Sequence, residues 1–200
     1  PIVMGSRSTY TRAGIGGFEG RALKTGDTVV CGELPPLWKR TVGFCCPEAL
    51  RPLRDPEAPI RAVPGPQDDA FTEEGLETLF GSIYTISTQA DRMGYRMEGP
   101  KVAHKAGADI VSDAIPLGAV QVPGHGQPIV MLADRQTTGG YTKAAVVLTA
   151  DLAVLAQRMP KEKVRFVRST PEEGAGLLAE RSRRLAELCR LRAEYRSRPA

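Results

Sequence analysis

The chain has 200 residues, of which 42% are hydrophobic and 25% charged, an ordinary composition for one globular domain or two small ones. No apolar run approaches the roughly 20 residues that cross a bilayer, and the amino terminus lacks a secretory pattern, so we expect a cytoplasmic protein without a membrane role. The net charge of +4 comes from arginines in the last twenty residues. The remainder is slightly acidic, which argues against a nucleic-acid-binding protein.

Several cofactor motifs are missing from the sequence. The four cysteines, Cys31, Cys45, Cys46 and Cys189, form no CxxC pair and no disulfide framework, so we expect reduced, mostly buried thiols and no metal site. The glycines of residues 14–20 fit neither the dinucleotide motif nor the phosphate loop.

The first 59 residues differ in composition from the rest. Residues 1–34 alternate glycine-rich turns with short strand-like pieces, and Gly26-Asp27 reads as a turn before a strand at 28–31. Residues 35–59 are rich in proline and arginine, which predicts an irregular connection. Ser6 to Thr9 either line a site or form a polar turn. We therefore expect 1–34 to be the end of an amino-terminal β-rich module.

Residues 60–168 read as one β domain with short helices, followed by a basic helix over 169–200. Helices are predicted at 71–80, where Thr72 is a good cap, at 150–159, and at 171–195, where Pro171 takes the first position. Leu178, Leu185, Leu188 and Tyr195 form an apolar seam that favours packing over RNA or membrane binding. Strands are predicted at 60–63, 82–87, 91–100, 119–122, 129–133, 144–148 and 163–167.

Polar chemistry is concentrated in residues 134–141, DRQTTGGY, between two apolar strands. The segment offers a carboxylate, a guanidinium, an amide, hydroxyls and two glycines whose freedom to adopt positive φ turns backbone N–H groups toward a ligand. We therefore interpret it as a binding loop for something small and polar. The alternative is a solvated hairpin in which Gly139 and Gly140 only supply the turn.

A charged stripe is predicted on the strand at 91–100, because its residues alternate with period two. Arg92 and Arg96 fall on one face, and Tyr95 lies on the other. Arginine recognises carboxylates and phosphates through its planar fork, so both are candidates to hold an acidic substrate. The alternative is a solvated face that pairs with Asp91 and Glu98.

Three segments together resemble a known family: GSRSTYTRAGIGGFEGRALKTGD near the start, DRMGYRMEGP, and SDAIPLGAVQVPGHGQPIVMLADRQTTGGYTKAAVV. They resemble the allophanate hydrolase subunit 2 family, which includes the carboxyltransferase half of urea carboxylase, the C subunit of the bacterial 5-oxoprolinase, and the KipA-type antagonist of a kinase inhibitor. The match runs from Gly5 to about Val167. The family's usual amino-terminal portion is not in these residues, so we expect a fragment or a processed piece.

The resemblance implies a mainly β fold, a cyclophilin-like β-barrel with short peripheral helices and a long C-terminal helix. It implies catalytic roles for Arg92, Asp134 and Thr138. Asp134 would orient the substrate amide or act as a base, and the turn beginning at Thr138 would stabilise an oxyanion beside Arg92. Substrate binding is expected from Arg96, Gln121, Gln136, Gly139, Gly140 and Tyr141.

For function, the resemblance implies one component of an ATP-dependent 5-oxoprolinase that opens 5-oxoproline to glutamate. It would act with a KipI-like protein, the B subunit of such enzymes, and ATP would bind through an unrecognised motif, in the missing half or on a partner. No Met-Lys-Met occurs, so this chain is not expected to carry biotin. The alternatives are a carboxyltransferase component of a urea-carboxylase-like system and a non-catalytic KipA-type antagonist.

Overall fold

The computed structural model describes residues 2–33, 41–51 and 55–197, and the chain divides into two compact units, Pro1–Val42 and Gly43–Ala200. The predicted connection over 35–59 lies partly outside the described residues, at 35–40 and 52–54. Arg198, in the predicted basic helix, also lies outside them.

The first unit is built from turns around one small antiparallel pair, β1 (Thr9–Tyr10) and β2 (Ile15–Gly16). Arg21 ties it together through a bidentate pair with Asp27, at 2.7 and 2.9 Å. The strand predicted at 28–31 is wrong: these residues are irregular, and Val30 is 90% exposed. Its β-branched residues favour an extended chain, but a strand also needs a neighbouring backbone to pair with.

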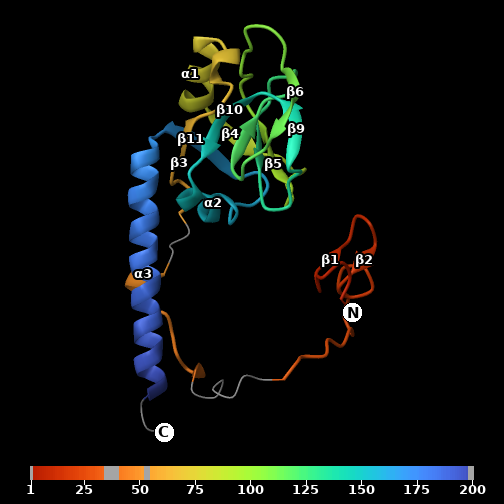
Figure 1. Cartoon of the computed structure of the whole chain (residues 1–200), viewed down its shortest axis with the longest axis vertical. Helices are drawn as coiled ribbons and strands as arrows, with labels where there is room; N and C mark the ends of the chain where they lie inside the picture. The colour runs from red at the N-terminus through yellow and green to blue at the C-terminus, as the bar shows by residue number, and fades with distance from the viewer. Residues whose placement is uncertain (1, 34–40, 52–54, 198–200) are drawn as a thin grey trace. The chain divides into compact units, whose positions relative to one another are not determined.

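The second unit is dominated by a closed barrel whose seven strands follow the order β10-β3-β11-β4-β5-β8-β7 (Figure 1). All pairs are antiparallel except β3 with β11. The predicted mainly-β barrel with short helices and a long C-terminal helix is confirmed. The strands are β3 (Ile60–Pro64), β4 (Ile83–Ile86), β5 (Gly94–Glu98), β7 (Ala119–Gln121), β8 (Ile129–Met131), β10 (Lys143–Val147) and β11 (Lys163–Arg168).

The two apolar strands at the centre of the sequence do not form a hairpin. β7 lies between β8 and β10 and pairs with both. The chain between β8 and β10 instead contains β9 (Thr138–Tyr141), which pairs with β6 (Asp109–Ala114) in a separate two-stranded ribbon. The predicted binding loop at 134–141 is therefore half strand, because β6 supplies it with a partner.

The β6–β9 ribbon covers part of the outer face of the barrel. On β7, Val120 belongs to the main core while Ala119 packs with Ile115 and Met131 in a second small cluster. Since successive side chains of a strand point to opposite faces, Gln121 lies on the same outer face as Ala119. Lys143 is its partner on β10.

A buried lysine joins the ribbon to the barrel. The Lys143 side chain is fully buried, and its Nζ lies 3.0 Å from Oδ2 of Asp113 on β6, which is half exposed. Gln67 donates to the same carboxylate oxygen at 3.4 Å and accepts from the backbone N–H of Lys143 at 3.3 Å. The Lys143 ammonium holds the pKa of Asp113 below its ordinary value.

Two short helices lie at opposite ends of the barrel (Figure 1). The helix α1 (Glu73–Gly81) is capped as predicted, since the Thr72 hydroxyl accepts from the backbone N–H of Gly75 at 2.9 Å. The helix α2 (Thr149–Leu155) carries buried Asp151, whose carboxylate accepts from the backbone N–H, Nε and Nη2 of Arg61 on β3 at 2.8, 2.9 and 2.6 Å. This pair fastens α2 to the barrel.

The long helix α3 (Pro171–Ser197) contacts α2 and then continues beyond the barrel (Figure 1). Its far part packs on the segment around the 3-10 helix η2 (Glu48–Leu50), where the rings of Tyr195 and Phe44 lie 5.4 Å apart. The predicted seam is wrong in part: Leu178 and Leu185 are 39% and 52% exposed. Leu188 and Tyr195 are partly buried as the seam predicts, and Leu177 and Leu191 are partly buried with them.

We predict that Asp151→Ala lowers the free energy of unfolding by about 2–3 kcal/mol, because it removes the buried carboxylate that accepts three hydrogen bonds from Arg61 and leaves the guanidinium only the half-exposed Glu173, 3.6 Å away. Urea denaturation followed by circular dichroism measures the change. Glu180→Ala is the matched control, since it removes an exposed carboxylate from an ion pair on α3 and should have almost no effect. Equal stability of the two variants would contradict the anchoring role.

We also predict that Asp113→Ala lowers the melting temperature more than the double change Asp113→Ala with Lys143→Met. The single change leaves a buried ammonium without its carboxylate, whereas the double change removes the charge and keeps an apolar chain of similar length. Scanning calorimetry compares the two. The idea fails if the double variant melts at or below the temperature of the single one.

Candidate functional site

Arg92 and Asp134 form a two-pronged ion pair at one end of the barrel. The Arg92 Nε and Nη2 donate to the two Asp134 carboxylate oxygens at 2.6 and 2.9 Å. The backbone brings them together, because the pairing of β5 with β8 continues past both strands through a 2.9 Å bond from the Asp134 N–H to the Arg92 carbonyl. The sequence alternative, in which Arg92 pairs with Asp91 or Glu98, is not what the structure shows.

The pair is accessible and electrostatically matched. The Arg92 side chain is 78% exposed and that of Asp134 is 50% exposed. The hydrogen bonds from Arg92 hold the pKa of Asp134 below its ordinary value, while those same bonds raise the pKa of Arg92. Asp134 is therefore a weak base and a ready hydrogen-bond acceptor.

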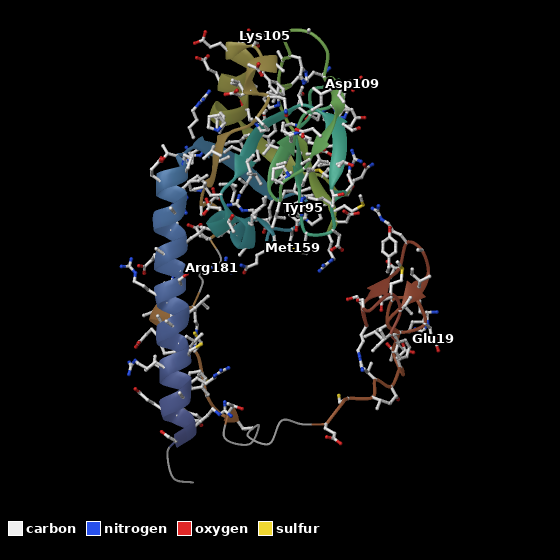
Figure 2. The ribbon with its side chains drawn as sticks, in the orientation of Figure 1. Glu19, Tyr95, Lys105, Asp109, Met159 and Arg181 are labelled. Atoms are coloured by element: carbon white, nitrogen blue, oxygen red, sulfur yellow. The ribbon has the colours of Figure 1, made fainter. Side chains whose placement is uncertain are left out.

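A cavity of about 620 Å³ opens beside Arg92. Its wall includes Leu132, Leu152 and Met159, and the partly buried Tyr95 donates its hydroxyl proton to the backbone carbonyls of Ala156 and Arg158. Figure 2 shows Tyr95 and Met159 at the lower end of the barrel. A pocket of this size with mostly apolar walls and a few charged groups is typical of small-molecule sites.

A second group of predicted residues meets under the ribbon. The buried Gln121 side chain donates from Nε2 to the Tyr141 carbonyl at 3.5 Å, and Gly139 lies against the same amide. This group and the Arg92–Asp134 pair lie toward opposite ends of β8, since Gln121 pairs with Ile129 whereas Asp134 follows Met131. The predicted site is thus divided between two places.

Gly139 and Gly140 do not supply the turn of positive φ that the sequence predicts. Neither Gly139 nor Gly140 has a positive φ, and both belong to β9. A Cβ at Gly139 would lie 2.6 Å from Cδ1 of Ile115 and 3.3 Å from Nε2 of Gln121. The absence of a side chain there lets the ribbon approach the barrel closely.

The other predicted residues are exposed and lie apart. Arg96 is on the outer face of β5, Gln136 is in the segment before β9, and Thr138 pairs with Ala114 across the ribbon. Among the residues that the structure describes, no hydrogen bond joins Thr138 to Arg92 or Asp134. The expected oxyanion turn beside Arg92 is therefore not formed by residues 138–140.

Sequence reasoning missed Lys143, Asp113 and Gln67 under the ribbon, and Arg181 at the cavity. Lys143 occupies the position before the predicted apolar strand, and the pattern gives no signal that a ribbon covers and buries this lysine. Arg181 lies on the basic helix α3 and lines the cavity from there, as only the packing of α3 on α2 reveals.

The cysteines do not form a further site. All four are free, but Cys31, Cys45 and Cys189 are exposed and Cys46 is only half-buried, so the expectation of mostly buried thiols is wrong. Over residues 2–33, 41–51 and 55–197, no three His, Cys, Asp or Glu side chains gather as a metal site. No helix within those ranges has the length and apolar character to cross a membrane.

Comparison with known proteins identifies relatives along most of the chain. Two proteins named as the C subunit of 5-oxoprolinase are similar: that of Haemophilus influenzae is 39% identical over 177 residues, and that of Escherichia coli is 36% identical over 188 residues. These alignments cover 88% and 94% of this chain, but 55% and 58% of the relatives. The chain therefore spans a little over half the length of these relatives.

A solved structure gives the same picture at lower identity. The urea carboxylase of Kluyveromyces lactis superposes with a TM-score of 0.77 at 25% identity, covering 94% of this chain and 18% of that one. The family model described as carboxyltransferase domain, subdomain A and B, matches residues 1–168. The family expected from the three motifs is thereby confirmed, and the chain belongs to the carboxyltransferase domain, subdomain A and B, family.

Proposed function

We propose that this chain is the C component of a 5-oxoprolinase complex, which opens 5-oxoproline to glutamate with ATP. The observation that carries the proposal is the similarity to two proteins named for that component, at 36–39% identity across 88–94% of the chain. In the overall reaction two water molecules are consumed: one adds across the lactam C–N bond as it breaks, and the other is used as ATP becomes ADP and phosphate. The ring nitrogen remains bonded to Cα and becomes the amine of glutamate.

The Arg92–Asp134 pair suits this substrate, which carries a carboxylate and a lactam amide on a small ring. Arg92 uses Nε and Nη2 for Asp134, so its Nη1 remains for the substrate carboxylate. The apolar wall formed by Leu132 and Leu152 fits the ring methylenes. The pair thus holds the substrate at the mouth of the cavity.

Asp134 has an orienting role in this proposal. Because Arg92 holds its pKa below the ordinary value, Asp134 stays ionised well into the acid range and accepts a proton poorly. Its carboxylate can instead accept a hydrogen bond from the lactam N–H. Activation of the carbonyl is assigned to ATP, and a KipI-like protein, the B subunit of the complex, is the proposed partner.

The test is ATP-dependent release of glutamate from 5-oxoproline by the complex purified through a tag on the full-length protein from its own cell. We predict that Asp134→Asn lowers kcat/KM by about 10- to 100-fold, and that Arg92→Ala raises KM for 5-oxoproline about tenfold or more, since each loses a charge-assisted hydrogen bond. The control is Arg165→Ala, an exposed arginine of β11 away from the pair. Undiminished turnover by Asp134→Asn would remove it from the site.

A second candidate is the carboxyltransferase component of a urea-carboxylase-like system. The TM-score of 0.77 with the Kluyveromyces lactis urea carboxylase over 94% of the chain favours it. The same purified complex, supplied with urea, bicarbonate, ATP and a biotinylated carrier, distinguishes the two. Urea-dependent consumption of ATP without release of glutamate from 5-oxoproline would favour this candidate over the first.

A further inference from the structure

The cavity beside Arg92 is completed by a helix outside the family match. The family model covers residues 1–168, whereas α3 begins at Pro171 and contributes Arg181 to the cavity lining. Figure 2 shows Arg181 on α3, with Met159 at the nearby end of the barrel. The matched residues supply two arginines to the lining, Arg92 and Arg158, and Arg181 is an addition to the part of the chain that defines the family.

The charges around the cavity are unequal. Asp91 also lines it, but its carboxylate accepts from the backbone N–H groups of Met93 and Gly94 at 2.8 and 3.3 Å. Asp134 is engaged by Arg92, and the buried Arg158 of the lining donates to the backbone carbonyls of Ala58 and Lys163. The guanidinium of Arg181, by contrast, is exposed, and no hydrogen bond or ion pair ties it to the residues that the structure describes. An uncompensated cation thus faces a mostly apolar hollow.

Three other arginines of α3 are held by glutamates of the helix or by nearby backbone carbonyls. Arg183 bonds Glu180 at 2.6 Å, Arg190 bonds Glu187 and Glu194, and Arg184 donates to the carbonyls of Ala49 and Arg51. Arg181 differs from these three because it lines the cavity. Its position, rather than the general charge of the helix, makes it a candidate ligand group.

We propose that the cavity binds an organic anion, with the anionic group held between Arg92 and Arg181 and the apolar body against Leu132, Leu152 and Met159. Guanidinium groups bind carboxylates and phosphates with charge-assisted hydrogen bonds, and a volume of about 620 Å³ admits a ligand larger than 5-oxoproline. Arg181 is then a specificity-determining residue that α3 supplies. The inference rests on the proposed function in its choice of probes, ATP and 5-oxoproline.

The experiment is isothermal titration calorimetry of the full 200-residue chain with ATP and, separately, with 5-oxoproline. We expect one site for at least one probe, with affinity that falls as salt is raised. Arg181→Ala should weaken binding about tenfold and Arg181→Glu more, since a charge-assisted hydrogen bond is lost and then replaced by repulsion. Ala153→Trp, which places a large ring in the cavity from the exposed face of α2, should abolish it.

Arg183→Ala is the matched control, being an arginine of the same helix that lies outside the cavity lining, and it should bind as the parent does. Binding of ATP alone assigns the cavity to the nucleotide, and binding of 5-oxoproline alone assigns it to the substrate. Absence of binding by both probes, or binding by Arg181→Glu and Ala153→Trp equal to that of the parent, overturns the inference. Binding by the parent chain together with no glutamate release by the purified complex would instead count against the proposed function and leave this inference standing.

Discussion

Closure of the barrel between β7 and β10 is the constraint on which the rest of the structure depends. It turns the outer-facing Gln121 toward Lys143, and this polar row receives the β6–β9 ribbon through Asp113. It also places Gly118, whose φ is +86°, at the opposite end of β7. There Gly118 donates its N–H to the Met131 carbonyl of β8 and accepts from the Val147 N–H of β10. Without that closure β8 and β10 would be free to pair directly, and the polar group under the ribbon would not form.

The two ends of the barrel have different physical characters. Under the ribbon, Lys143 is fully buried and its contacts are satisfied by the protein itself, which suits a part that holds its shape. At the other end, the Arg92–Asp134 pair is exposed, and Arg92 borders a hollow. Exposed polar side chains that lie together beside a cavity can give up a contact with each other to bind a ligand. The proposed function therefore relies on the exposed end.

The sequence predicted most strands and all three helices, because alternation, caps and the proline at position 171 are local signals. It could not predict strand order: β7 separates β8 from β10 through contacts that no window of residues contains. For the same reason β9 was interpreted as a loop. Residue type alone predicts Arg92 and Asp134 as candidates, but their mutual pairing depends on β5 lying beside β8. Lys143 and Arg181 were missed, since burial of a lysine and the packing of α3 arise only in the fold.

Binding of the substrate where Arg92 and Asp134 meet the cavity is the central claim. A crystal structure of the purified complex with 5-oxoproline tests it most directly. We predict the substrate carboxylate at the Arg92 guanidinium, the lactam N–H toward Asp134, and the ring against Leu132. Substrate bound under the β6–β9 ribbon beside Lys143, with the Arg92–Asp134 pair untouched, would contradict it.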